Sequence, residues 1–70
     1  MFNPIDVYVG KRIRLKRKLA GLTQSGLAAK IGITFQQVQK YEKGENRVSS
    51  SMLYQIAQAL RTQESIYIED

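Results

Sequence analysis

The stretch TQSGLAAKIGITFQQVQKYEKG, residues 23–44, contains two successive pairs of helix-starting and helix-ending residues. Thr23 and Thr34 are residue types favoured at the N-cap, where a hydroxyl oxygen accepts a hydrogen bond from the first turn of a helix. Gly32 and Gly44 are typical helix stops, because glycine readily adopts the left-handed conformation that ends helices. The stretch therefore predicts two short helices joined by a tight turn, at residues 23–31 and 34–43.

A longer helix is predicted before this stretch. Asn3 is suited to the N-cap and Pro4 to the first helical position, where its missing N–H costs nothing. The helix would run to Ala20, and Gly21 would end it.

A fourth helix is predicted to start at Ser49 or Ser50. Its apolar residues have helical spacing and are Met52, Leu53, Ile56, Ala57 and Leu60. From Arg61 onward the chain could form a fifth short helix or an extended segment, and the helix is the preferred interpretation. The pattern as a whole predicts an all-α fold of four to five short helices in a single domain over residues 1–70.

The composition excludes several functions. Cysteine and histidine are both missing from the 70 residues, which argues against a disulfide, a metal site and the usual catalytic side chains. No apolar run approaches the ~18 residues needed to span a bilayer, and no signal-peptide pattern opens the chain. We therefore expect a cytoplasmic protein that is not an enzyme, with no cofactor, no small-molecule ligand and no membrane partner.

Positive charge is concentrated in the first two thirds of the chain. Ten of the eleven Lys and Arg residues lie between Lys11 and Arg47, a stretch with only two acids, Glu42 and Glu45. The last seven residues hold three acids and no base. Such an asymmetry favours a polyanionic partner, of which nucleic acid is the commonest.

The predicted helix 34–43 has two different faces. At about 100° per residue, Val38, Tyr41 and Glu42 share one arc. The opposite arc holds one aromatic ring, two amides and two amines, on Phe35, Gln36, Gln39, Lys40 and Lys43. These groups can contact base edges, thymine methyls and phosphates, although a merely solvated face would look the same. Gln37 falls at the border, where it is placed to complete a capping box with Thr34.

Two charged residues fall on apolar arcs. Glu42 is one, and Arg17 is the other, within the stripe that Val9, Ile13 and Ala20 form on the first helix. Because a charged side chain is rarely buried without a partner, we expect a structural ion pair between Arg17 and Glu42. The alternative is that both side chains extend to water.

The stretch from Val9 to Leu60 resembles the helix-turn-helix domain of the Xre/Cro/CI class, the phage-repressor-like transcription regulators. The resemblance covers about three quarters of the chain and rests on many positions at fixed spacing. They are Arg17, Gly21, Leu22, Thr23, Gln24, Leu27, Ala28, Ile31, Gly32, Ile33, Thr34, Val38, Tyr41, Glu42 and Gly44. It implies a compact bundle of four to five short helices, in which the second and third helices form the DNA-binding unit and an Arg–Glu pair links the first and third helices.

The resemblance also implies roles for individual residues. The third helix would enter the major groove, with Phe35, Gln36 and Lys40 at the base-contacting positions. Gln39, on the same outward arc, is included as a further base contact. The positions implied for phosphate contacts or the groove edge are Gln24, Thr34, Lys43, Asn46, Arg47 and Ser49.

The chain departs from the family pattern at Gly26, where an acidic residue is usual, so the second helix lacks one partner of its capping box. Phe35 is bulky for an exposed groove residue and could instead pack beside Ile33.

The sequence thus predicts a sequence-specific, double-stranded DNA-binding regulator, acting as a repressor and as a homodimer on a two-fold operator. Candidate dimer surfaces are the tail (Ile66, Tyr67 and Ile68) and an apolar strip on the first helix (Tyr8, Leu15 and Leu19). A coactivator-type protein-interaction module of the same fold, with only non-specific DNA binding, is the alternative. A membrane-surface role for the first helix is disfavoured, because its cations point in nearly all directions.

Overall fold

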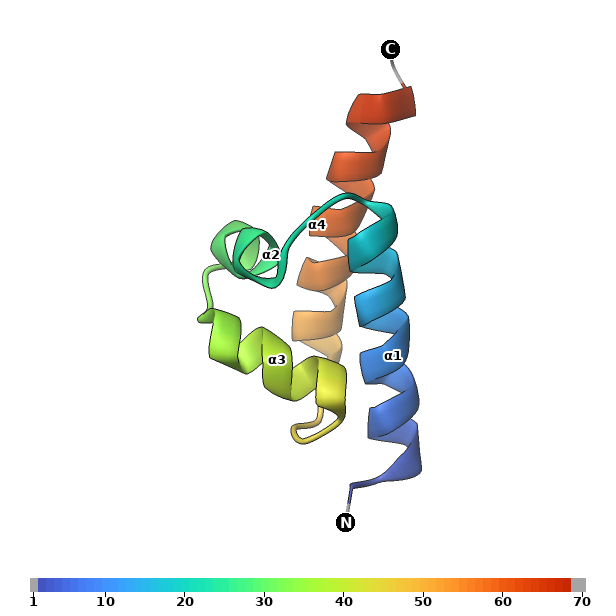
Figure 1. Ribbon diagram of the computed structural model, residues 1–70, viewed down its shortest axis with the longest axis vertical. Coiled ribbons are helices and arrows are strands. Elements are labelled where there is room, and N and C mark those ends of the chain that lie inside the picture. The colour runs from blue at the N-terminus through green and yellow to red at the C-terminus, as the bar shows by residue number, and fades with distance from the viewer. Residues whose placement is uncertain (1, 69–70) are drawn as a thin grey trace.

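Four helices make up the computed structural model, which describes the backbone of residues 2–68 and the side chains of residues 2–61. They are α1 (Pro4–Leu19), α2 (Gln24–Ile31), α3 (Phe35–Lys43) and α4 (Ser50–Ile68), and the described residues contain no strand. The two long helices α1 and α4 run side by side, and the two short helices α2 and α3 cover one side of them (Figure 1). The all-α bundle predicted from the sequence is confirmed, with four helices.

Side-chain oxygens cap the helix N-termini at the predicted residues. Asn3 Oδ1 accepts from the Ile5 amide at 2.8 Å. The hydroxyls of Thr23, Thr34 and Ser49 accept from the amides three residues on, at 2.9, 3.2 and 3.1 Å respectively. Each bond satisfies one of the amides that a helix start leaves without a partner in the helix.

The C-terminal segment does not form a separate helix as predicted. Residues from Arg61 onward continue α4 without a break, as far as Ile68. The physical reason is that residues 58–65 contain no glycine or proline that would end a helix. The side chains proposed from this tail as a dimer surface (Ile66, Tyr67 and Ile68) lie outside the described side chains.

The hydrophobic core lies where all four helices meet. Leu27 of α2 and Val38 of α3 are its largest fully buried side chains. Ile13, Ala20, Ala28, Ile56 and Leu60 surround them. Two residues of the apolar pattern on α4 lie outside the core, because Leu53 is 41% exposed and Ala57 is also exposed.

The backbones of α1 and α3 approach closely at two glycines. A Cβ atom on Gly10 would lie 2.6 Å from the carbonyl oxygen of Glu42, and closer still to that of Tyr41. Gly44, which ends α3 with φ at 79°, is packed against Val7, whose Cα would lie 2.7 Å from an added Cβ. The C-terminal end of α3 is therefore held directly against α1.

Candidate nucleic-acid interface

Helix α3 exposes the arc that its sequence predicted and buries the other. Val38 and Glu42 are buried, and Tyr41 packs partly buried against the core. Gln36, Lys40 and Lys43 are exposed, Phe35 is 42% exposed and Gln39 is half-buried. A face that carries amides, amines and an aromatic edge is thus open to solvent along the helix.

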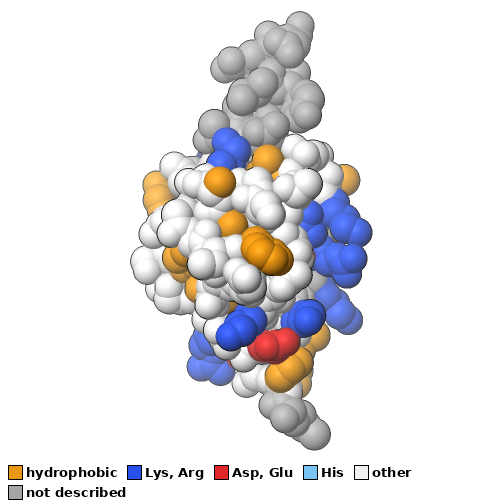
Figure 2. Space-filling model, turned by 60° about the vertical axis from the view of Figure 1, so that its left-hand side comes forward, with side chains coloured by type: hydrophobic (Ala, Val, Ile, Leu, Met, Phe, Trp, Pro, Cys, Tyr) orange, Lys and Arg blue, Asp and Glu red, His pale blue; other side chains and the backbone are white. Residues whose placement is uncertain are grey.

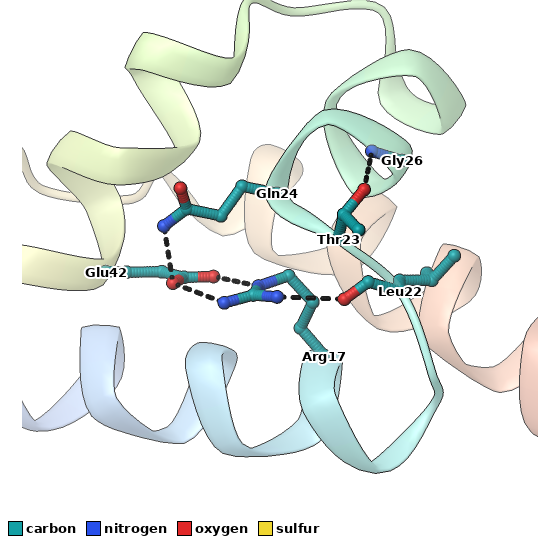
Figure 3. A network of polar contacts seen from close by, with 6 residues as sticks. All are labelled: Arg17, Leu22, Thr23, Gln24, Gly26 and Glu42. Carbon is teal, nitrogen blue, oxygen red and sulfur yellow. Dashed lines mark hydrogen bonds and ion pairs between the residues drawn. The ribbon is translucent and has the colours of Figure 1, made fainter.

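A buried network of hydrogen bonds holds the inner side of α3 (Figure 3). Arg17 Nε lies 2.6 Å from Glu42 Oε2, and Arg17 Nη2 lies 3.1 Å from Glu42 Oε1. Both side chains are almost fully buried, at 8% and 3% exposed. The two parallel bonds give the fork geometry in which a guanidinium pairs best with a carboxylate. The expected pair thus has the geometry of a buried bidentate bridge from α1 to α3.

The same network extends to the turn before α2 and to its first residue. Arg17 Nη1 donates to the carbonyl oxygen of Leu22 at 2.8 Å, and Gln24 Nε2 donates to Glu42 Oε1 at 3.0 Å. Gln24, expected at a phosphate, therefore has one amide hydrogen committed inside the protein. Its second amide hydrogen and its carbonyl oxygen make no hydrogen bond to the described residues. The contact with Leu22 could not be predicted from the sequence, because every residue has a backbone carbonyl oxygen and the residue type does not indicate which one accepts.

The hydroxyls expected at phosphates are also helix caps. Thr34 Oγ1 and Ser49 Oγ each accept a backbone amide of their own helix. A hydroxyl that accepts one bond still has its own hydrogen to donate. Ser49 Oγ also lies 3.3 Å from the hydroxyl of Ser51, which belongs to the first turn of α4.

The loop between α3 and α4 is tied to α1 by an ion pair that the sequence did not predict. Arg47 Nε lies 3.2 Å from Asp6 Oδ1. The Arg47 side chain is 72% exposed, whereas Asp6 is only 15% exposed. Asp6 lies in the first turn of α1, and nothing in the sequence indicates that it pairs with a residue 41 positions away. The two terminal nitrogens of Arg47 make no hydrogen bond to the described residues.

Gln37 does not complete the expected capping box. Its backbone amide donates to Thr34 Oγ1, but the reciprocal bond, in which the side-chain oxygen of Gln37 would accept from the Thr34 amide, does not form among the described residues. Half of the box is therefore present, and the Gln37 side chain lies half-buried at the border of the two arcs.

Basic side chains border the side of the molecule on which α2 and α3 lie. Figure 2 shows Lys and Arg atoms along one edge and across the lower part, around a largely uncharged surface. Lys40, Lys43, Asn46 and Arg47 are all exposed. The structure therefore brings an exposed polar helix face together with cations and capped helix starts.

Residues 13–66 match the model of a helix-turn-helix family. The chain belongs to this family, in its Xre/Cro/CI class. The family consists of non-enzymatic transcriptional regulators, which supports the expectation that the chain is not an enzyme.

Relatives of the chain are transcriptional regulators as well. It is 54% identical over 68 residues to an HTH-type transcriptional regulator of Sinorhizobium medicae. This alignment covers 97% of the chain and 49% of the relative. A transcriptional regulator in the ATPase CF(0) region of Rhodospirillum rubrum is 47% identical over 94% of this chain and 61% of the relative. An HTH-type regulator of Methanothermobacter thermautotrophicus is 42% identical over 83% of this chain and 87% of the relative.

The chain spans about half the length of the first of these relatives. No solved structure matches it. Within the described residues, no helix is both long and apolar enough to cross a membrane.

Proposed function

We propose that this helix-turn-helix domain binds double-stranded DNA in a sequence-specific manner and places α3 in the major groove. The observation that carries the proposal is the two-sided character of α3. Its inner side is fixed by Glu42 in the network with Arg17 and Gln24, while its outer side leaves Gln36 and Lys40 exposed. A helix held rigidly with amides and amines outward is what direct readout of base edges requires.

The proposed contacts fall into two groups. Phe35, Gln36, Gln39 and Lys40 are proposed to contact bases. The proposed phosphate contacts surround them and are Gln24, Thr34, Lys43, Asn46, Arg47 and Ser49. Contacts to phosphates position the domain on the duplex, and contacts to base edges give sequence preference.

We propose further that the domain acts as a repressor and binds its operator as a homodimer. A single domain of this size offers few base contacts, and two half-sites about one helical turn apart are the usual remedy. The support is the small number of exposed side chains on α3.

Selection of bound duplexes from a random DNA pool tests the proposal. We expect a defined sequence, repeated with two-fold symmetry, and sedimentation of the complex with two protein chains per duplex. Recovery of no preferred sequence, with equal affinity for all duplexes, would favour the alternative function as a protein-interaction module.

A further inference from the structure

An apolar groove lies between α1 and α4 and has no part in the proposed DNA contact. Its volume is about 270 Å³, which has room for a few side chains. Leu53, Ile56 and Ala57 of α4 form part of its floor, and Arg12, Lys16 and Arg61 also line it. Among the residues whose side chains the structure describes, no acidic one lines it.

The groove opens on a different side of α1 from the one that contacts α3. Gly10 and Arg17 of α1 face α3, as the close approach and the ion pair show. At 100° per residue, Arg12 and Lys16 lie roughly 100° or more around the helix axis from them. The cations of the groove are therefore separate from those proposed to hold phosphates.

These cations have no counter-charge in the described part of the protein. The ion pairs there join Arg17 to Glu42 and Arg47 to Asp6. Arg12, Lys16 and Arg61 are exposed and form no ion pair with any described residue. The groove thus combines exposed apolar surface, at Leu53 and Ala57, with three positive charges that no described side chain pairs.

We propose that this groove docks an acidic amphipathic helix of a partner protein. An apolar channel between two helices accepts a row of side chains at helical spacing, which is how amphipathic helices bind grooves. Carboxylates on the flanks of that helix would meet Arg12, Lys16 and Arg61, so charge complementarity selects an acidic partner.

Two other occupants fit the groove less well. In a symmetric contact between two copies, the same patch faces itself, so the three cations of each copy would repel those of the other. DNA would satisfy the cations but would leave the apolar floor without a partner, since phosphates bring no apolar group to it.

A designed peptide probe tests the docking site directly. The probe is an acidic helix of about 20 residues, long enough to span about 30 Å, with leucines along one face and glutamates on the other. Titrated into the isotope-labelled chain, it should shift the amide signals of Arg12, Lys16, Leu53 and Ala57 in a saturable manner. The signals of α3 should stay in place.

Matched variants separate the groove from general attraction. Arg12→Glu with Lys16→Glu should weaken peptide binding by about tenfold or more, as loss of complementary charge predicts. Arg14→Glu with Lys18→Glu, the same charge change on the opposite flank of α1, should weaken it far less. Leu53→Ser, in the groove, should weaken peptide binding. Leu15→Ser should not, because Leu15 is similarly exposed but lies on α1 outside the groove. Melting curves establish that each variant is folded.

Four outcomes would overturn the proposal. Equal effects of the two charge reversals would show that the peptide responds to the net charge of the protein and not to the groove. Equal binding by a probe with serines in place of its leucines would show that the apolar floor of the groove does not contribute to binding. The same shifts with random-sequence duplex DNA would assign the groove to nucleic acid. The same shifts on raising the protein concentration alone would assign it to a second copy.

Discussion

Gln24 at the start of α2 donates a hydrogen bond to Glu42 near the end of α3, over 3.0 Å. The same carboxylate receives the guanidinium of Arg17 from α1. One buried acid thus joins three of the four helices, and its full set of partners explains how a charge is tolerated there. This side chain helps to fix the angle between α2 and α3, together with the packing of Leu27 against Val38 in the core.

Replacing Glu42 by Gln should destabilise the domain by about 3 kcal/mol, because Arg17 would stay buried without its counter-charge. Thermal or denaturant unfolding measures the loss. Asp6→Asn is a suitable comparison, since it breaks the ion pair to the exposed Arg47 and should cost under about 1 kcal/mol. A double mutant of Arg17 and Glu42 whose loss equals the sum of the single losses would show that the two residues do not interact.

Gly10→Ala should destabilise the domain by more than about 2 kcal/mol, since the added methyl group would meet backbone carbonyls of α3 that cannot move aside. The gain in helix propensity, up to about 1 kcal/mol, is smaller. Gly26→Ala is the matched change in α2. Its methyl group would lie 3.2 Å from Thr23 Oγ1 and 3.5 Å from Leu22 Cδ2, so its effect should stay within about 0.5 kcal/mol. Similar unfolding curves for the two variants would contradict the close approach at Gly10.

Lys43→Ala should weaken binding by a similar factor on every DNA sequence, because a phosphate contact carries no base preference. The slope of log affinity against log salt should become shallower by about 0.9, the value for one phosphate. Lys18→Ala removes the same charge from α1, about 90° around that helix from the face that contacts α3, and should leave the slope nearly unchanged. Titrations at several salt concentrations give both slopes, and an unchanged slope for Lys43→Ala would exclude Lys43 from the interface.

Gln36→Ala should keep stability within about 0.5 kcal/mol, as expected for an exposed side chain. It should cost about 1 to 3 kcal/mol of specific binding and relax the preference at one base pair per half-site. Gln37→Ala should change neither property much, because the cap at Thr34 uses its backbone amide rather than its side chain. Titrations against the selected operator and its single-base variants decide between them. Relaxed preference in Gln37→Ala but not in Gln36→Ala would reverse the assignment of the reading residue.

Features set by neighbouring residues in the chain were predictable from the sequence. The caps at Asn3, Thr23 and Thr34 and the left-handed turns at Gly32 and Gly44 depend on local chemistry, so residue types reveal them. The continuous α4 was missed, although residues 58–65 carry no stop signal, because the tail shows no strong apolar pattern that would extend the helix.

Contacts between distant segments were harder to predict. Arg17 and Glu42 could be paired because each interrupts an apolar arc, and the structure has them 2.6 Å apart. Asp6 and Arg47 interrupt no pattern, and neither does the carbonyl oxygen of Leu22. The groove between α1 and α4 escaped prediction as well, since helical spacing grouped Leu53 and Ala57 with core residues and could not show how far apart two helices lie.

The turn at Gly44 bears on the entropy of binding. The chain leaves α3 at the point where its backbone touches Val7, so the loop that carries Asn46 and Arg47 starts from a fixed anchor. The ion pair with Asp6 on α1 also restrains the side chain of Arg47. Ordering a long side chain on association costs about 0.5 to 1.5 kcal/mol. Part of that conformational entropy has already been lost on folding, so this loop loses less of it when a ligand binds.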